Sequence, residues 1–234
     1  EGVSLSQLLR RARAHRPPHL IIPILVDLLE GLHAAHTAVD EHGAPLCLVH
    51  RDVSPQNVLV GLDGTARIID FGVAKARSRL TATREGMLKG KLQYIAPEML
   101  DSIEPDARAD IWSAGVVAWS SLTARKLFGA HNDAATMRNI LGRPIAAPSQ
   151  IGSRPPAAYD RVILRALERN LDLRYASAHE MAEDLQRIAM EAGHWGSRKA
   201  VGAWVRRLFG DELEARRNEI RACADRATGA ASRF

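Results

Sequence analysis

The sequence predicts a mainly α-helical domain that carries one small β-hairpin. Aromatic residues form only 5% of the 234 residues, and alanine and arginine are plentiful, a balance that favours helices over a β-sandwich. The pair Asp63 and Gly64 stands between two runs of β-forming residues, which is a strong short-range hairpin signal. With 46% hydrophobic and 25% charged residues, the chain has the composition of a folded globular protein.

Apolar residues at helical spacing predict the helices in order. Ser4 is the expected N-cap of the first, and a longer helix after Pro17 and Pro18 would hold Pro23 in its first turn. Ser177 and Glu180 have the spacing of a capping box. Apart from the helix after Pro18, the helices are predicted at residues 5–14, 110–128, 132–141, 159–170 and 177–192. Residues 110–128 are expected to form the buried central helix, because the first half of this segment is apolar almost all round.

The hairpin is expected at residues 57–70, after a short strand at residues 46–50. A two-residue turn at Asp63 and Gly64 would set Asn57 opposite Asp70, with their side chains on one face about 4.5–5.5 Å apart. An amide oxygen and a carboxylate would then lie side by side, shortly after Asp52. This arrangement is the outline of a cation site. Residues 71–98, with few periodic apolar positions, are expected to form a long loop.

The last part of the chain, residues 193–234, is predicted to form two basic amphipathic helices, a C-terminal extension. Trp204 and Leu208 are expected to pack against the domain or a partner instead of lying on a membrane. The net charge of +5 comes without interleaved aromatic residues or zinc-ligand spacing, so no nucleic-acid partner is expected.

Two further features bear on the compartment. The longest apolar run, residues 20–29, is interrupted by Pro23 and Asp27 and is too short to cross a bilayer, so no membrane span is expected. Cys47 and Cys223 fit no metal-ligand spacing, which indicates reduced thiols and a cytoplasmic location.

Three short motifs follow one another at fixed spacing: HRD with a later asparagine (residues 50–52 and 57), DFG (70–72) and APE (96–98). Together with YIAPE, DIWSAGV and DLRYASAHEM, they resemble the signature set of bacterial protein kinases of the eukaryotic Ser/Thr type. The resemblance covers residues 1–192. It implies the C-terminal lobe of a protein kinase, which uses ATP and Mg²⁺, phosphorylates a protein substrate and acts in signalling.

The resemblance also implies the roles of individual residues. Asp52 matches the catalytic residue that receives or orients the proton of the substrate hydroxyl. Asn57 and Asp70 match the ligands that hold magnesium on ATP, in agreement with the predicted hairpin pairing. Four residues match structural positions: His50 in the core, Asp110 bonded to the backbone of the catalytic loop (residues 50–57), and Glu98 and Arg174 as a buried ion pair.

Regulation is implied by one arginine and two threonines. Arg51 matches an arginine that pairs with a phosphorylated residue of the activation segment in many relatives. Thr81 and Thr83 lie in that segment beside Arg79 and Arg84, which makes them candidate autophosphorylation sites; unmodified loop threonines remain the alternative.

The catalytic loop departs from the family pattern at Ser54, where most relatives have a lysine. A threonine of the activation segment, which partners that lysine in relatives, is replaced here by Lys91. We expect the two groups to have traded places, with Lys91 bringing its charge near Asp52 and donating a hydrogen bond to Ser54. The alternative is that Lys91 points to solvent or recognises acidic substrates.

No glycine-rich loop, strand lysine or helix glutamate precedes His50. The resemblance places Glu1 just after the hinge, so a small lobe that covers ATP would be supplied upstream in the intact gene product. The chain is therefore expected to bind MgATP weakly or not at all. Two functions stay open: the catalytic lobe of a Ser/Thr kinase, and a catalytically inactive lobe or pseudokinase that binds proteins.

Overall fold

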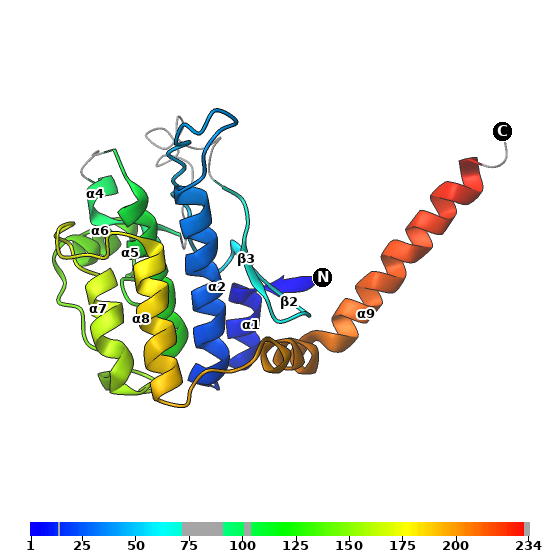
Figure 1. Ribbon diagram of the computed structural model, residues 1–234. Coiled ribbons are helices and arrows are strands. Elements are labelled where there is room, and N and C mark those ends of the chain that lie inside the picture. Colours follow the sequence, from blue (N-terminus) through cyan, green and yellow to red (C-terminus); the bar gives the residue numbers. More distant parts are fainter. Residues whose placement is uncertain (14, 72–90, 101–103, 232–234) are drawn as a thin grey trace.

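The computed structural model describes residues 1–13, 15–71, 91–100 and 104–231 (Figure 1). Its centre is α2 (Pro18–His36), which packs against α5 (Ala107–Thr123), α8 (Ala178–Glu191) and β3 (Ala66–Ile68). The described part is rich in helices with one small sheet, as the composition predicts.

The sheet has three strands in the order β1-β2-β3, one more than the predicted hairpin. β1 (Gly2–Ser4) pairs antiparallel with β2 (Val58–Gly61) and leads directly into α1 (Leu5–Ala12). Ser4 caps α1 as expected, since its hydroxyl accepts a hydrogen bond from the backbone N–H of Gln7 at 3.2 Å. A strand of three residues is too short to show alternation, so the sequence pattern missed it.

The register of the hairpin differs from the predicted one by one residue. Val58 lies opposite Ile68 and Gly61 opposite Thr65, so the loop holds three residues instead of two. Gly64 has a φ of +80°, as the left-handed residue of a three-residue hairpin loop requires. Asn57 therefore lies opposite Ile69, whose N–H donates to its carbonyl at 2.9 Å, and the predicted pairing of Asn57 with Asp70 is wrong.

The central helix α2 begins earlier than predicted. It starts at Pro18, so Pro23 lies in its second turn and not in the first. By length and composition alone α2 could span a membrane, but it is mostly buried among the other helices of the domain. Burial on several sides explains why its residues 20–29 are almost all apolar.

The remaining helices follow the predicted order with shifted ends. The predicted strand at residues 46–50 is absent from the structure, because Cys47 has a positive φ of 49° and the segment has no strand beside it in the described part. Asp106 caps α5 and Asn132 caps α6 (Asp133–Gly142), so both helices begin one residue after their caps. The elements not yet named are η2 (Leu92–Tyr94), α4 (Pro97–Leu100), η3 (Pro148–Gln150), η4 (Ala157–Tyr159) and α7 (Asp160–Ala166).

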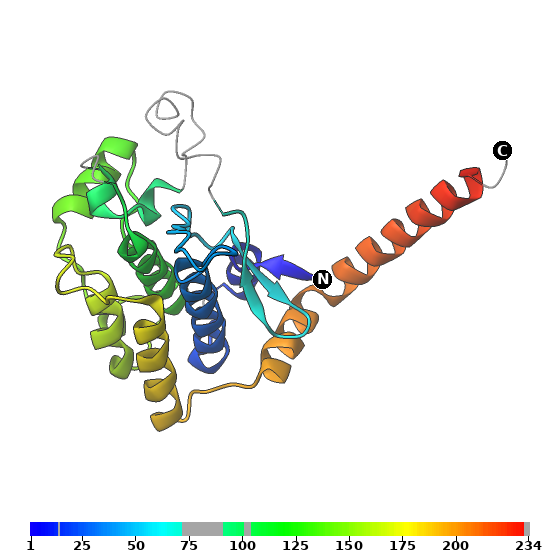
Figure 2. The ribbon, with the colours of Figure 1, turned by 45° about the horizontal axis from the view of Figure 1, so that its top comes forward.

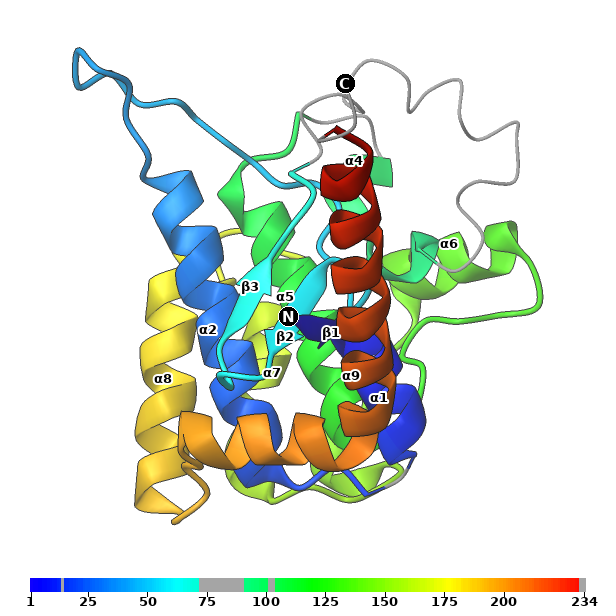
Figure 3. The same ribbon diagram turned by 90° about the vertical axis from the view of Figure 1, so that its right-hand side faces the viewer.

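The C-terminal extension is one helix, α9 (Arg198–Ala231), instead of the two predicted. Gly210 does not end it, because an interior glycine costs only about 1 kcal/mol relative to alanine. Its first part packs Trp204 and Val205 against the domain, with partly buried Leu208 beside them, which confirms the expected packing of the extension. Figure 1 shows that its outer part leaves the body of the domain, and Figure 3 shows that α9 changes direction between its first and its outer part.

The start of α9 lies against the hairpin turn (Figure 2). The guanidinium of Arg206 donates to the carbonyl of Leu62 at 2.7 Å. A Cβ at Gly64 would lie 1.8 Å from the carbonyl oxygen of Arg198, and a Cβ at Gly202 would lie 2.4 Å from that of Leu62. Only glycine allows so close an approach at these two positions.

Candidate active site

The first turn of α5 holds the loop at residues 50–57 through hydrogen bonds. Asp110, fully buried, accepts hydrogen bonds from the backbone N–H groups of His50 and Arg51 at 2.7 and 2.8 Å. This is the contact that the resemblance implies for Asp110. Arg51 itself has a φ of 62°, and the two bonds to the carboxylate hold the loop in this uncommon conformation.

A third hydrogen bond to Asp110 comes from a residue that the sequence did not indicate. His36, at the end of α2, places Nε2 2.8 Å from Oδ2 of Asp110, and both side chains are almost fully buried. The contact joins α2, α5 and the loop at one carboxylate. A lone histidine 14 residues before His50 has no spacing signal that could have predicted it.

His50 is a core residue, as expected, and its ring orients the loop. Nδ1 accepts from the backbone N–H of Asp52 at 3.2 Å, so the proton belongs on Nε2, which donates to the carbonyl of Ile69 at 3.0 Å. The ring also contacts Phe71, with the centroids 4.6 Å apart. His50 therefore connects the loop to the end of the hairpin and has no nitrogen left to act as a base.

Asp52, Asn57 and Lys91 meet at one place. The ammonium of Lys91 lies 2.8 Å from Oδ2 of Asp52, and Asn57 Nδ2 donates to the same carboxylate oxygen at 3.1 Å. The side chain of Asp52 is only 11% exposed, so the ion pair is shielded from most solvent. The structure thus brings a cation from the activation segment to the aspartate of the loop, and Lys91 does not point to solvent.

Ser54 does not take part in this contact. It is 1% exposed, and its hydroxyl has no hydrogen-bond partner among the described residues. The predicted hydrogen bond from Lys91 to Ser54 is therefore absent, because the ammonium pairs with the carboxylate of Asp52, a stronger acceptor than a hydroxyl. Ser54 has a small side chain at the position where the resemblance implies a lysine in most relatives.

The ion pair that anchors the activation segment is present and buried. Arg174 donates from two guanidinium nitrogens to the two carboxylate oxygens of Glu98, at 2.8 and 3.1 Å. It also donates to the carbonyls of Arg108 and Glu168, both at 2.8 Å, and lies over the ring of Trp112. Four of its five N–H groups thus have acceptors, and such additional hydrogen bonds are what a buried ion pair needs to be stabilising.

Two predicted regulatory residues, Thr81 and Thr83, lie outside the described residues. Arg51 is described, and its guanidinium lies 3.4 Å from the exposed carboxylate of Glu104. A weak surface pair of this kind leaves the arginine able to exchange partners.

A second contact that the sequence did not indicate is made by the hydroxyl of Ser113. It donates a hydrogen bond to the carbonyl of Tyr94 at 2.7 Å and connects α5 to η2.

Comparison with known proteins identifies the family. The model of the protein kinase domain matches residues 1–185 of this chain. The chain belongs to the protein kinase family. The motifs quoted above and the geometry of the loop are therefore those of a kinase domain.

The kinases to which the chain is similar are bacterial. It is 35% identical to the tyrosine-protein kinase MasK of Myxococcus xanthus over 222 residues, which cover 94% of this chain and 34% of MasK. It is 34% identical to the serine/threonine-protein kinase PknL of Mycobacterium tuberculosis over 191 residues, 82% of this chain and 46% of PknL. The chain thus spans between about a third and a half of the length of these relatives.

Protein kinases use ATP with magnesium, and the donors in this chain fit such an ion. Both amide hydrogens of Asn57 are engaged by Asp52, at its carbonyl (2.7 Å) and its carboxylate, which leaves Oδ1 as the atom that can ligate a cation. Asp70, exposed at the end of β3 with a φ of 60°, offers a carboxylate. Two oxygen ligands suit Mg²⁺, which keeps waters and phosphate oxygens as its other ligands.

Proposed function

We propose that residues 1–192 are the C-terminal lobe of a protein kinase that transfers the γ-phosphate of ATP to a hydroxyl group of a protein. The observation that carries this proposal is the arrangement at Asp52: a shielded carboxylate with a cation on one side and a metal-ligand amide on the other. Phosphoryl transfer asks a protein mainly for positioned charges of this kind.

Each residue has one task in this proposal. Asp52 orients the attacking hydroxyl and accepts its proton, since its carboxylate is held through Asn57 and Lys91. Asn57 and Asp70 would hold magnesium, which neutralises charge on the transferred phosphate. Lys91 supplies, from the activation segment, the cation that most relatives carry at the position of Ser54.

We further propose that transfer needs a second lobe. Neither a glycine-rich loop nor a strand lysine for the α- and β-phosphates stands among these 234 residues. Residues 1–192 supply the part of the active site that belongs to the C-terminal lobe. The small lobe, which covers ATP, is supplied by a further part of the intact gene product. The 234-residue chain alone is then inactive.

The test compares two proteins under one assay. The 234-residue chain and a longer chain that includes the preceding coding region are incubated with radiolabelled ATP, Mg²⁺ and a general protein substrate. We expect label only with the longer chain, and none when it carries Asp52→Asn. Strong labelling by the 234-residue chain contradicts the need for a second lobe. A longer chain with all kinase motifs that stays inactive favours the protein-binding alternative.

The acceptor is proposed to be serine or threonine, with tyrosine as the second candidate. The catalytic loop lacks the arginine-containing variant typical of tyrosine kinases, and PknL is named a serine/threonine kinase. MasK, which is 35% identical, is named a tyrosine kinase, and this relative keeps the second candidate open. Acid hydrolysis of the labelled substrate decides between them, because it releases phosphoserine, phosphothreonine and phosphotyrosine as separate species.

A further inference from the structure

A pocket of about 390 Å³ opens where the C-terminal ends of α1 and α5 meet the loop after η3. Four arginines line it, namely Arg10, Arg13, Arg16 and Arg125, and no aspartate or glutamate does. We call it the arginine pocket. The kinase motifs assign no role to it.

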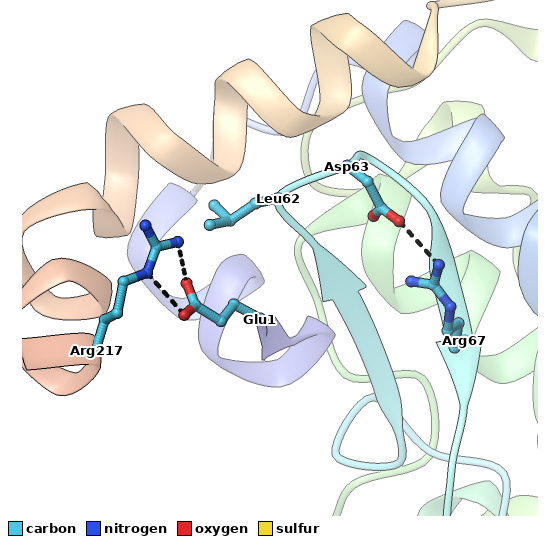
Figure 4. A pocket seen from close by; sticks show the side chains of 5 residues that line it. All are labelled: Glu1, Leu62, Asp63, Arg67 and Arg217. Atoms are coloured by element: carbon cyan, nitrogen blue, oxygen red, sulfur yellow. Dashed lines mark hydrogen bonds and ion pairs between the residues drawn. The ribbon is translucent and has the colours of Figure 1, made fainter. Parts of the chain in front are cut away.

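A second pocket shows that arginines alone do not make such a site. Around the pocket in Figure 4, each guanidinium already has a carboxylate: Arg217 pairs with Glu1 at 2.6 Å, and Arg67 with Asp63 at 2.8 Å. The arginines of the arginine pocket form no ion pair with any described residue. Its charge is therefore uncompensated.

Arg16 is built into the floor of the arginine pocket. Its guanidinium donates to the carbonyl of Ser120 at 3.0 Å and to that of Leu9 at 3.1 Å, near the ends of α5 and α1. Its Nε is buried without a hydrogen-bond partner, and burial lowers the pKa of this group. A half-buried cation with no counter-charge is costly, which is expected where an anion completes the site.

The backbone around the arginine pocket is in an uncommon conformation. In the described part, six residues other than glycine have a positive φ; Arg13 (52°) and Ala124 (55°) line this pocket, and Arg154 (49°) follows it directly. Two others, Arg51 and Asp70, belong to the active site. Backbone strain of this kind clusters at functional sites.

The wall of the arginine pocket is closed by its own backbone. The N–H of Ser153 donates to the carbonyl of Thr123 at 2.9 Å, and the N–H of Arg125 donates to the hydroxyl of Thr123 at 3.2 Å. Gly152, at φ +57°, leaves no room for a Cβ, which would lie 1.9 Å from the same carbonyl. These backbone donors are used, so the side chains of Arg10, Arg13 and Arg125 are the donors open to a ligand.

We propose that the arginine pocket binds a phosphate monoester. A monoester carries a charge of about −1.5 to −2 and three acceptor oxygens, so it can engage several guanidinium groups at once, whereas a carboxylate engages one fork. Thirteen residues of α5 separate Thr123 from Asp110, which places the pocket about 20 Å from the catalytic loop. An extended segment covers that distance with about six residues. A protein phosphorylated at one position could thus be held here while another of its hydroxyl groups lies at Asp52.

The test measures binding to the 234-residue chain without ATP, so its outcome does not depend on the proposed function. The probes are a flexible Gly-Ser peptide with one central phosphoserine, its unphosphorylated form, its glutamate form, and inorganic phosphate. Calorimetry is run on the wild type, on the triple variant Arg10→Gln, Arg13→Gln, Arg125→Gln, and on a control triple variant. The control changes three exposed, unpaired arginines elsewhere: Arg138→Gln, Arg161→Gln and Arg207→Gln.

We expect the phosphopeptide to bind at least tenfold more weakly to the pocket variant and within twofold of wild type to the control. Phosphopeptide binding tighter than that of inorganic phosphate identifies a protein segment as the source; equal affinities identify the free ion and contradict a monoester ligand. No binding to the wild type, equal losses in both variants, or equal binding of the glutamate peptide overturns the proposal. Arg13→Gln alone, at an exposed side chain, should lose about half as much in log affinity if the triple variant misfolds.

Discussion

Lys91 and Asp52 form an ion pair at 2.8 Å, although 39 residues separate them. The carboxylate is mostly shielded from solvent and also accepts from Asn57, so the three side chains constrain one another. The resemblance to kinases implies that most relatives bring a cation to this place from the position of Ser54, two residues after the aspartate. Here it comes from the facing segment, and the buried serine leaves room for it.

The first prediction concerns turnover. In the kinase with its second lobe, Lys91→Ala should lower kcat by about 100-fold or more, because it removes the charge that we propose acts on the transferred phosphate. The double variant Ser54→Lys, Lys91→Thr should recover much of the loss, since it restores the arrangement of most relatives. The exposed Lys126→Ala is the control and should not change kcat.

The same assay separates two roles of Lys91. If Lys91 only recognised acidic substrates, Lys91→Ala would raise KM for acidic peptides and leave kcat intact. A kcat that stays within twofold of wild type would contradict a role in transfer.

Much of the helical frame could be predicted from the sequence, because apolar spacing and capping residues act locally. Ser4, Asn132 and Ser177 each cap a helix, because the side-chain oxygen accepts a hydrogen bond from the backbone N–H three residues later. The hairpin register could not be predicted, since Asp63 and Gly64 suit both a two-residue and a three-residue loop. In the structure the hairpin has the three-residue loop, and it contacts β1 and α9, two elements outside the hairpin.

The site shows the same division between local and distant information. The proximity of Lys91 to Asp52 could be predicted, since two replacements in separate motifs made sense only together. The bond from His36 to Asp110 could not, because it depends on how α2 and α5 pack and on no motif. Nor could the sequence predict that the hydroxyl of Ser54 has no hydrogen-bond partner among the described residues, since this depends on the position of the Lys91 ammonium.

A second prediction concerns stability. Arg174→Met should lower the free energy of unfolding by about 3–5 kcal/mol, because it leaves the buried carboxylate of Glu98 without its partner. Urea unfolding of the 234-residue chain measures the change. The control is Arg187→Met, which breaks an exposed pair with Asp184 and should cost less than about 1 kcal/mol. Equal decreases in the free energy of unfolding of the two variants would show that the buried pair stabilises the fold no more than the exposed pair does.

A third prediction concerns the C-terminal extension. Trp204, 3% exposed, packs against the domain, so Trp204→Ala should cost about 3–5 kcal/mol of unfolding free energy. Arg207→Ala, on the exposed side of the same helix, should be nearly neutral. Sedimentation with anionic vesicles tests the membrane alternative: binding that disappears on changing Arg206 and Arg207 would favour a membrane, whereas the packed helix should not bind.

The last prediction uses the three tyrosines of the chain, Tyr94, Tyr159 and Tyr175. Burial raises the pKa of all three phenols, to about 12 for Tyr94 and Tyr159 and further for Tyr175, which also donates to Asp184. Phenolate absorbance should therefore stay low through pH 10 while the chain is folded. The neutral phenols stabilise the fold below pH 10, and this contribution is lost as pH rises from about 10 toward 12, because only the unfolded chain then ionises freely. Absorbance at 295 nm and circular dichroism, followed together, should change in one step above pH 10. A phenol that titrates near pH 10 with the helical signal intact would contradict the buried packing of that tyrosine.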